Sequence, residues 1–294
     1  MKVAVQSLVR NYSIEATVIQ AQRIARFAGL VVPGTRVYIP HTPHTNFDQV
    51  VALAGRLRRE GMEPVPHIVA RRIENEPALE TLLSRLTGEA GVRQALIVAG
   101  DMATPAGSLY NTLQILESGL LEKYKIQSIG VAGHPEGHPN VGDAILRDAL
   151  RRKNDYGFNT GTNVYVVTQF TFSANPIIAW EKAYGSDIGA LNITAGLPGL
   201  ATASTLLKYA MECGVGASLE AFSKRYASII KLLTISTPGD IIVGLARYKR
   251  KAPKSRLSGV HFFTFGGFQP TAEWANKIVD GNFEITEDGG LVIN

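Results

Sequence analysis

Short runs of β-branched and other apolar residues recur along the chain, and between them apolar residues return every three or four positions. The first pattern is typical of buried strands, and the second of amphipathic helices. Their alternation predicts repeated βα units and a parallel sheet. The expected strands span residues 12–17, 36–40, 63–69, 94–98, 128–132, 164–170, 191–195 and 260–265.

Eight strands are the number that closes a β/α barrel, and a chain of 294 residues is long enough for one. The segment 201–246 is too long for one helix and is interrupted at Gly214, Gly216 and Pro238, so two or three helices are expected there. We therefore predict an α/β fold, a single (β/α)8 barrel over residues 1–294 with extra helices before the last strand. The helical stripes that should face the barrel wall are Val18, Ala21, Ala25 and Ala28; Phe47, Val50, Val51 and Ala54; Leu79, Leu82, Leu83 and Leu86; and Leu109, Leu113 and Leu116.

The composition, with 45% hydrophobic and 19% charged residues, indicates a soluble globular protein. No apolar run is long enough to span a membrane, and the N-terminus reaches Arg10 and Glu15 too early for a signal peptide. A cytoplasmic location is therefore expected. Cys213 is the only cysteine, which excludes an intrachain disulfide and a thiolate metal cage, and we expect it to be a small buried apolar residue.

The formal net charge of +5 suits an anionic small molecule. The densest basic run, residues 247–256, contains one aromatic residue and precedes the last strand. In a β/α barrel this position lies on the face opposite the active site. We therefore expect no nucleic-acid partner.

Histidines gather at the predicted strand ends, where a parallel barrel places its active site. None falls in a predicted helix, so the sequence indicates a polar pocket at that end. The six are His41, His44, His67, His134, His138 and His261.

The first predicted strand presents Ser13 and Glu15 toward the barrel axis if Ile14 and Ala16 face the wall. Partial burial disfavours an ionised carboxyl group, so the pKa of Glu15 should rise and the residue could act as a general acid. A salt-bridged interior carboxylate is the alternative interpretation.

Polar residues also follow the fourth, fifth and sixth predicted strands. Gly100 would let a ligand approach the backbone, and Asp101 would hydrogen-bond a ring N–H or amino group, although turns use the same pair of residues. The sixth strand closes on Gln169 and Phe170, which could bind a heterocycle by hydrogen bonding and stacking. In the turn 133–140, prolines restrict the chain and orient its polar side chains, which are His134, Glu136 and His138.

The chain resembles the methylenetetrahydrofolate reductases from its first predicted strand to its last. Three segments carry the resemblance: residues 130–139 with the sequence GVAGHPEGHP, 167–170 with VTQF, and 260–264 with VHFFT. The resemblance implies an oxidoreductase that interconverts 5,10-methylenetetrahydrofolate and 5-methyltetrahydrofolate by hydride transfer through bound FAD.

The family also implies roles for individual residues. Glu15 matches the catalytic glutamate that assists protonation of the folate nitrogen, and Asp101 matches the aspartate that contacts the pterin and influences flavin reactivity. Gln169 matches the glutamine that hydrogen-bonds the pterin, with Phe170 beside it. The residues implied in FAD binding are His67, Gly100, Asp101, Tyr110, Ala132, His134, Glu136, His138 and Lys153. The motifs leave open the electron donor, NAD(P)H or another, and whether the chain forms a homo-oligomer.

Three positions depart from the family pattern. Ala99 stands where the family carries an arginine before the Gly-Asp pair, which removes a bidentate anchor. The second strand runs into the sequence IPHTPH rather than a Thr-Tyr-Gly-Ala turn, and His134 replaces a tyrosine. These changes predict either weakened flavin binding or a flavin-free enzyme in which hydride passes directly from the nicotinamide to the folate.

Two other classes of function remain open from the sequence. A metal-dependent barrel hydrolase could use His41, His44, His67 and Asp101. Against it, Pro43 lies between the first two histidines and no His-x-His pair ends the first strand, so no metal ligand is expected. A non-catalytic folate- or flavin-binding barrel is the other.

Overall fold

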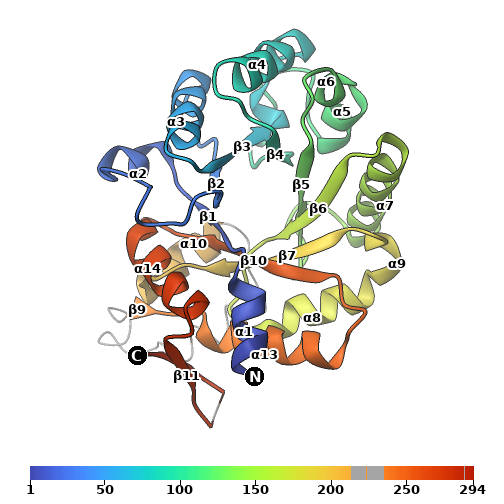
Figure 1. Ribbon diagram of the computed structural model, residues 1–294. Coiled ribbons are helices and arrows are strands. Elements are labelled where there is room, and N and C mark those ends of the chain that lie inside the picture. Colours follow the sequence, from blue (N-terminus) through green and yellow to red (C-terminus); the bar gives the residue numbers. More distant parts are fainter. Residues whose placement is uncertain (213–222, 224–234, 288) are drawn as a thin grey trace. The chain divides into compact units, whose positions relative to one another are not determined.

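Eight parallel strands form a closed barrel, which confirms the predicted (β/α)8 fold. The structure is a computed structural model that describes residues 1–212, 223, 235–287 and 289–294 (Figure 1). The hydrogen-bonded order is β1-β10-β7-β6-β5-β4-β3-β2. Every predicted strand is present, and the predicted ends differ from the observed ends by at most three residues. The strands are β1 Ser13–Glu15, β2 Arg36–Ile39, β3 Glu63–Val69, β4 Gln94–Val98, β5 Ser128–Gly133, β6 Asn163–Thr168, β7 Asn192–Pro198 and β10 Leu257–Phe263.

Helices lie between the strands, and two short antiparallel ladders join them: β8 Ala201–Thr202 with β9 Ile235–Ser236, and β11 Phe283–Ile285 with β12 Leu291–Ile293. Across the described residues, no helix combines the length and apolar character that a bilayer crossing requires. The helices are α1 Lys2–Val9, α2 Val18–Arg23, α3 Phe47–Arg59, η1 Ala70–Arg72 (3-10), α4 Glu76–Gly88, α5 Thr112–Glu117, α6 Leu120–Lys123, α7 Asp143–Thr160, α8 Ala174–Ala183, α9 Gly185–Ile188, α10 Ala203–Glu212, α13 Gly239–Lys251 and α14 Phe268–Val279.

The chain divides into two compact units, which are described separately. Unit 1 comprises residues 1–14, 133–147 and 167–294, and unit 2 comprises residues 15–132 and 148–166. In unit 2, strands β2, β3, β4 and β5 pair in parallel, and α3 and α4 lie outside them (Figure 1). Asn46 and Asn75 begin these two helices by accepting hydrogen bonds from backbone N–H groups of the first turn.

In unit 1, β10 pairs with β1 on one edge and β7 on the other, with Ser13 opposite His261 and Ala195 opposite Val260. Ile14, Ala195 and Val260 are fully buried. These strands are covered on both faces, which explains the continuous apolar runs in the sequence.

Two of the predicted helical stripes were wrong at their ends. Helix α2 ends at Arg23, and Ala25 is exposed. The carbonyls of Ala21 and Ile24 accept hydrogen bonds from the Arg56 guanidinium, while Phe27 is buried. Leu109 likewise precedes α5.

The segment before the last strand contains α10 and α13 among the residues that the structure describes, in agreement with the expected extra helices. Cys213, Gly214 and Gly216 lie outside the described residues.

Candidate active site at the strand ends

Glu15 ends β1, between the fully buried Ile14 and Ala16, and its side chain is mostly buried. Burial raises the pKa of Glu15 to about 8, which confirms the direction predicted from strand alternation. The carboxyl group therefore carries a proton in much of the population at neutral pH. Its Oε2 lies 3.9 Å from Nε2 of His67 in β3.

His67 stays neutral next to this carboxyl group. Burial, followed by repulsion from His41 at low pH where that ring is protonated, lowers the pKa of His67 to about 3. The ring meets Tyr38 edge-on, with 6.0 Å between the ring centroids. Its Nε2 is buried and makes no hydrogen bond to any residue that the structure describes. A proton on Glu15 is thus not drawn onto His67.

The 3-10 helix η1 directly follows β3 and places Arg72 beside Asp101, which follows β4. The distance from Nη2 of Arg72 to Oδ1 of Asp101 is 3.3 Å. The side chain of Arg72 is 13% exposed, whereas that of Asp101 is 85% exposed. Sequence analysis did not select Arg72, although its position immediately after a predicted strand could have identified it.

The loop after β4 is fixed to η1 by backbone and side-chain hydrogen bonds. Nη1 of Arg71 donates to the carbonyls of Met102 and Ala103, and the N–H of Ala106 donates to the carbonyl of Arg71. A Cβ atom at Gly107 would lie 1.8 Å from the carbonyl oxygen of Glu74. The loop that presents Asp101 is therefore packed directly on the turn that presents Arg72.

Gly100 has a structural reason to be glycine. Its φ of +99° is a conformation that other residues rarely adopt, and a Cβ atom there would lie 2.5 Å from Cγ1 of Val69. The contact of Gly100 with flavin that the resemblance implies stays a prediction.

Burial, followed by the charge of Arg72, lowers the pKa of His41, so its ring is neutral. Together, Glu15, His67, His41, Arg72 and Asp101 form what we call the polar row. It combines a protonated carboxylic acid, two neutral imidazoles, a cation and an exposed carboxylate within unit 2.

Three further candidate residues follow β5 in unit 1. The rings of His134 and His138 meet edge to face at 5.1 Å, and Glu136 between them is half-buried. The N–H of Asn140 donates to Nδ1 of His138 over 3.1 Å. Burial lowers the pKa of His138. The structure brings the two histidine rings together in this turn.

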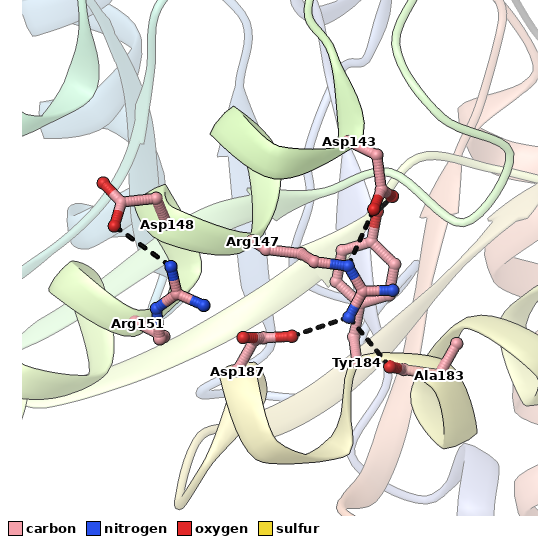
Figure 2. Close-up of polar contacts among 7 residues, drawn as sticks. All are labelled: Asp143, Arg147, Asp148, Arg151, Ala183, Tyr184 and Asp187. Carbon is pink, nitrogen blue, oxygen red and sulfur yellow. Dashed lines mark hydrogen bonds and ion pairs between the residues drawn. The ribbon is translucent and has the colours of Figure 1, made fainter.

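The Arg147 cluster holds the helix that follows this turn (Figure 2). Nε of Arg147 lies 2.7 Å from Asp143, and Nη1 lies 2.7 Å from Asp187 and 2.9 Å from the carbonyl of Ala183. The guanidinium lies over the ring of Tyr184, 3.9 Å from its centroid, and the hydroxyl of Tyr184 donates to Asp143. Sequence analysis missed the cluster, although Asp143 and Arg147 have the spacing of a helical ion pair.

Gln169 and Phe170 follow β6 and have different surroundings. The backbone N–H of Gln169 donates to the carbonyl of Gly133, and its side-chain oxygen accepts from the N–H of Phe170, which leaves the amide NH₂ as the donor for a ligand. Phe170 is only 1% exposed and packs against Phe172 and Phe263. Its ring is therefore placed to support those two aromatic side chains rather than to present a contact surface itself.

The remaining residues implied in flavin binding lie in unit 2. Tyr110 is exposed, and Ala132 is half-buried. Lys153 in α7 is buried, and burial lowers the pKa of its amine to about 8. Among the described residues it has no ion-pair or hydrogen-bond partner. A buried ammonium of this kind fits an anionic ligand group, such as a phosphate of FAD.

A metal-dependent hydrolase gains no support from the geometry. Over the described ranges, no group of three or more His, Cys, Asp or Glu side chains is arranged to hold a metal ion.

Comparisons with known proteins support the fold. A solved protein from Clostridium thermocellum, described as binding two copies of 5-methyl-5,6,7,8-tetrahydrofolic acid, aligns with a TM-score of 0.57 and 13% identity. The alignment covers 94% of this chain and 98% of that one. The protein CutC from Streptococcus agalactiae aligns over 69% of this chain and 95% of its own, with 13% identity and a TM-score of 0.36, too low to carry an argument. No protein-family model matches the chain. The similarity to the Clostridium protein shows the barrel fold.

Proposed function

We propose that this protein is a folate-binding oxidoreductase of the methylenetetrahydrofolate reductase type, which interconverts 5,10-methylenetetrahydrofolate and 5-methyltetrahydrofolate. The observation that carries the proposal is Glu15, a carboxylic acid that burial keeps largely protonated at neutral pH at the end of a barrel strand. The Clostridium thermocellum protein of the same fold, which is described as binding 5-methyltetrahydrofolate, supports a folate as the ligand.

In the proposed mechanism, Glu15 is the general acid. It gives its proton to the folate nitrogen, so that an iminium can form on the one-carbon unit and accept hydride. A pKa of about 8 suits this role, because the acid is present at neutral pH and still releases its proton readily. His67, with a pKa of about 3, does not compete for the proton. In the reverse direction, the ionised Glu15 takes the proton back.

Asp101 would orient the pterin ring, because its exposed carboxylate can accept hydrogen bonds from ring N–H or amino groups. Gln169 lies in the other unit, and the pterin contact that the resemblance implies for it stays a prediction.

FAD would be held with the help of Lys153, a mostly buried lysine whose amine would gain a phosphate as its counter-charge. His67, Tyr110 and Ala132, which lie in the same unit, are the other proposed contacts. When bound, FAD supplies the group that carries the hydride.

The first experiment is an absorption spectrum of the purified protein, followed by anaerobic titration with FAD and with 5-methyltetrahydrofolate. We expect flavin bands that bleach when 5-methyltetrahydrofolate is added. A protein that stays colourless and does not bind FAD would overturn the cofactor assignment, and direct transfer from NAD(P)H would then be measured in the same sample.

The role of Glu15 is tested with Glu15→Gln, which keeps the shape of the side chain but cannot donate a proton. We expect unchanged affinity for 5-methyltetrahydrofolate and turnover lowered by about 100-fold or more. In the unsubstituted enzyme, turnover in the methylene-reducing direction should fall above about pH 8 as Glu15 ionises. Glu89→Gln, at an exposed glutamate following α4, is the matched control. If Glu15→Gln retains full turnover, Glu15 is not the acid.

A further inference from the structure

We infer that Arg72 is an anion-binding residue, whose guanidinium holds a carboxylate or phosphate group of the ligand at the polar row. The inference rests on the proposed function, because it places a charged part of a folate or of a dinucleotide in unit 2. Neither the resemblance nor the comparisons assign a role to this residue.

Arg72 has more hydrogen-bond donors than it has partners in the described chain. A guanidinium has five N–H donors and stays charged in proteins. In the part of the chain that the structure describes, the Arg72 guanidinium makes a single contact, to Asp101 at 3.3 Å, although its side chain is only 13% exposed. That contact is long and involves one nitrogen, with an aspartate that is itself largely in solvent. The side chain is therefore mostly buried, while most of its donors make no hydrogen bond to the described residues and remain open to solvent.

Two other arginines of unit 2, Arg56 and Arg58, make several hydrogen bonds within the chain. Arg56, 28% exposed, donates to Glu60 at 2.8 Å and to three backbone carbonyls at 2.7, 2.6 and 3.1 Å. Arg58, 34% exposed, holds both oxygens of Glu63 at 2.6 and 2.7 Å and a backbone carbonyl at 2.9 Å. Arg72 has the lowest side-chain exposure of the three and the fewest hydrogen bonds. Its remaining nitrogens are not closed off from solvent, whereas Nε of Arg58 is buried without a partner in the described chain. The unused donors of Arg72 are therefore open to a ligand.

The surroundings of Arg72 favour an added anion. His41 lies near Arg72, and its Nδ1 is buried without a hydrogen-bond partner in the described chain, so a second unused hydrogen-bonding group stands beside the guanidinium. Asp101 is exposed and holds Arg72 by one long contact, which a ligand anion can replace. The planar guanidinium suits the two-oxygen geometry of a carboxylate or phosphate. The loop 101–108 is already fixed to η1, so binding would order little additional chain.

Two parts of the proposed ligands carry such an anion, and paired titrations distinguish them. Removing Arg72 should weaken binding only of the ligand that carries the charged group. Affinities of Arg72→Gln are measured for 5-methyltetrahydrofolate against a tetrahydropterin without the glutamyl tail, and for FAD against riboflavin. A glutamyl carboxylate at Arg72 predicts a loss of about 10- to 100-fold for 5-methyltetrahydrofolate and none for the pterin. A phosphate predicts the same loss for FAD and none for riboflavin.

Two further variants make the test specific. Arg72→Lys keeps the charge and loses the planar fork, so its affinity should fall between those of wild type and Arg72→Gln. Arg85→Gln, in α4 with its contacts to Asp48 and Glu89, produces the same change in net charge and should bind every ligand as wild type does.

The inference is overturned if Arg72→Gln is folded by circular dichroism and binds all four ligands as wild type does. That result leaves the proposed function intact. If the wild type binds none of the four, the proposed function fails, and Arg72 is tested with inorganic pyrophosphate. A melting temperature that pyrophosphate raises in wild type but not in Arg72→Gln supports the anion site, and no difference removes it.

Discussion

The Arg147 cluster and the polar row each place an arginine among carboxyl groups, but they satisfy it very differently. Arg147, 30% exposed, donates to two aspartates and a backbone carbonyl and stacks on Tyr184 (Figure 2). Arg72, 13% exposed, has one long contact with an exposed aspartate. The Arg147 guanidinium makes its hydrogen bonds within the chain, whereas the Arg72 guanidinium keeps donors that a ligand can use.

The Arg147 cluster and the polar row also differ in the protonation states of their carboxyl groups. In the Arg147 cluster, the hydrogen bond from Tyr184, followed by that from Arg147, lowers the pKa of Asp143, so this carboxylate is ionised and paired. In the polar row, burial raises the pKa of Glu15 to about 8 and lowers that of His67 to about 3. Burial that holds Glu15 and His67 away from their ordinary charge states lowers the stability of the folded chain. Such shifted pKa values are typical of functional sites.

The largest expected effect concerns the pH dependence of stability in the polar row. Between about pH 4.5 and 8, the unfolded chain releases the Glu15 proton while the folded chain retains it, so Glu15 lowers the free energy of unfolding as pH rises. His67 acts in the opposite direction, but only from about pH 3 to 6.5. Glu15→Gln should therefore be more stable than wild type by about 4 kcal/mol at pH 8. Urea unfolding at pH 6.5, 7.25 and 8 measures the difference, and an offset that does not grow over this range would contradict it.

The next effect tests whether the Arg147 cluster stabilises the fold. Arg147→Met removes the cation beside Asp187, whose side chain is almost fully buried. We expect the free energy of unfolding to fall by about 2 kcal/mol. Arg151→Met is the control, because Arg151 pairs with Asp148 on the same helix and both side chains are exposed. That change should cost less than about 0.5 kcal/mol. Equal losses for the two variants would show that the cluster has no structural role.

The smallest effect is expected for Arg72→Gln in the absence of ligand. Its one ion pair reaches an exposed carboxylate, so the free energy of unfolding should change by less than about 0.5 kcal/mol. A loss as large as that of Arg147→Met in the same urea titration would make Arg72 a structural residue and remove the contrast between the two clusters.

The strands were predictable because they are short, apolar and separated by helical patterns, and burial on both faces produces continuous runs such as 94–98. The early end of α2 could not be predicted. Arg56, more than 30 positions away, donates hydrogen bonds to the carbonyls just after this helix. The ladder of β8 with β9 pairs residues 201–202 with 235–236, and no local pattern indicates that pairing.

The candidate site shows the same division. Strand alternation was enough to place Glu15 in partial burial and to predict the direction of its pKa shift. The pairing of Arg72 with Asp101, and the absence of further partners for Arg72, depend on how the chain turns after β3 and β4. Asp187 lies 40 residues from Arg147, so only the tertiary structure reveals that they form an ion pair. The individual binding roles carried over from the resemblance stay predictions.

The close approach at Gly107 has a mechanical consequence for the polar row. With the Glu74 carbonyl where a Cβ atom would be, and with Ser108 and Ala106 hydrogen-bonded to the same turn, the loop after β4 and the turn after β3 are clamped together along their backbones. A ligand that binds Asp101 and shifts its loop would therefore also shift the segment that carries Arg72. Asp101 and Arg72 are therefore presented to a bound molecule at a spacing that the close backbone approach at Gly107 fixes.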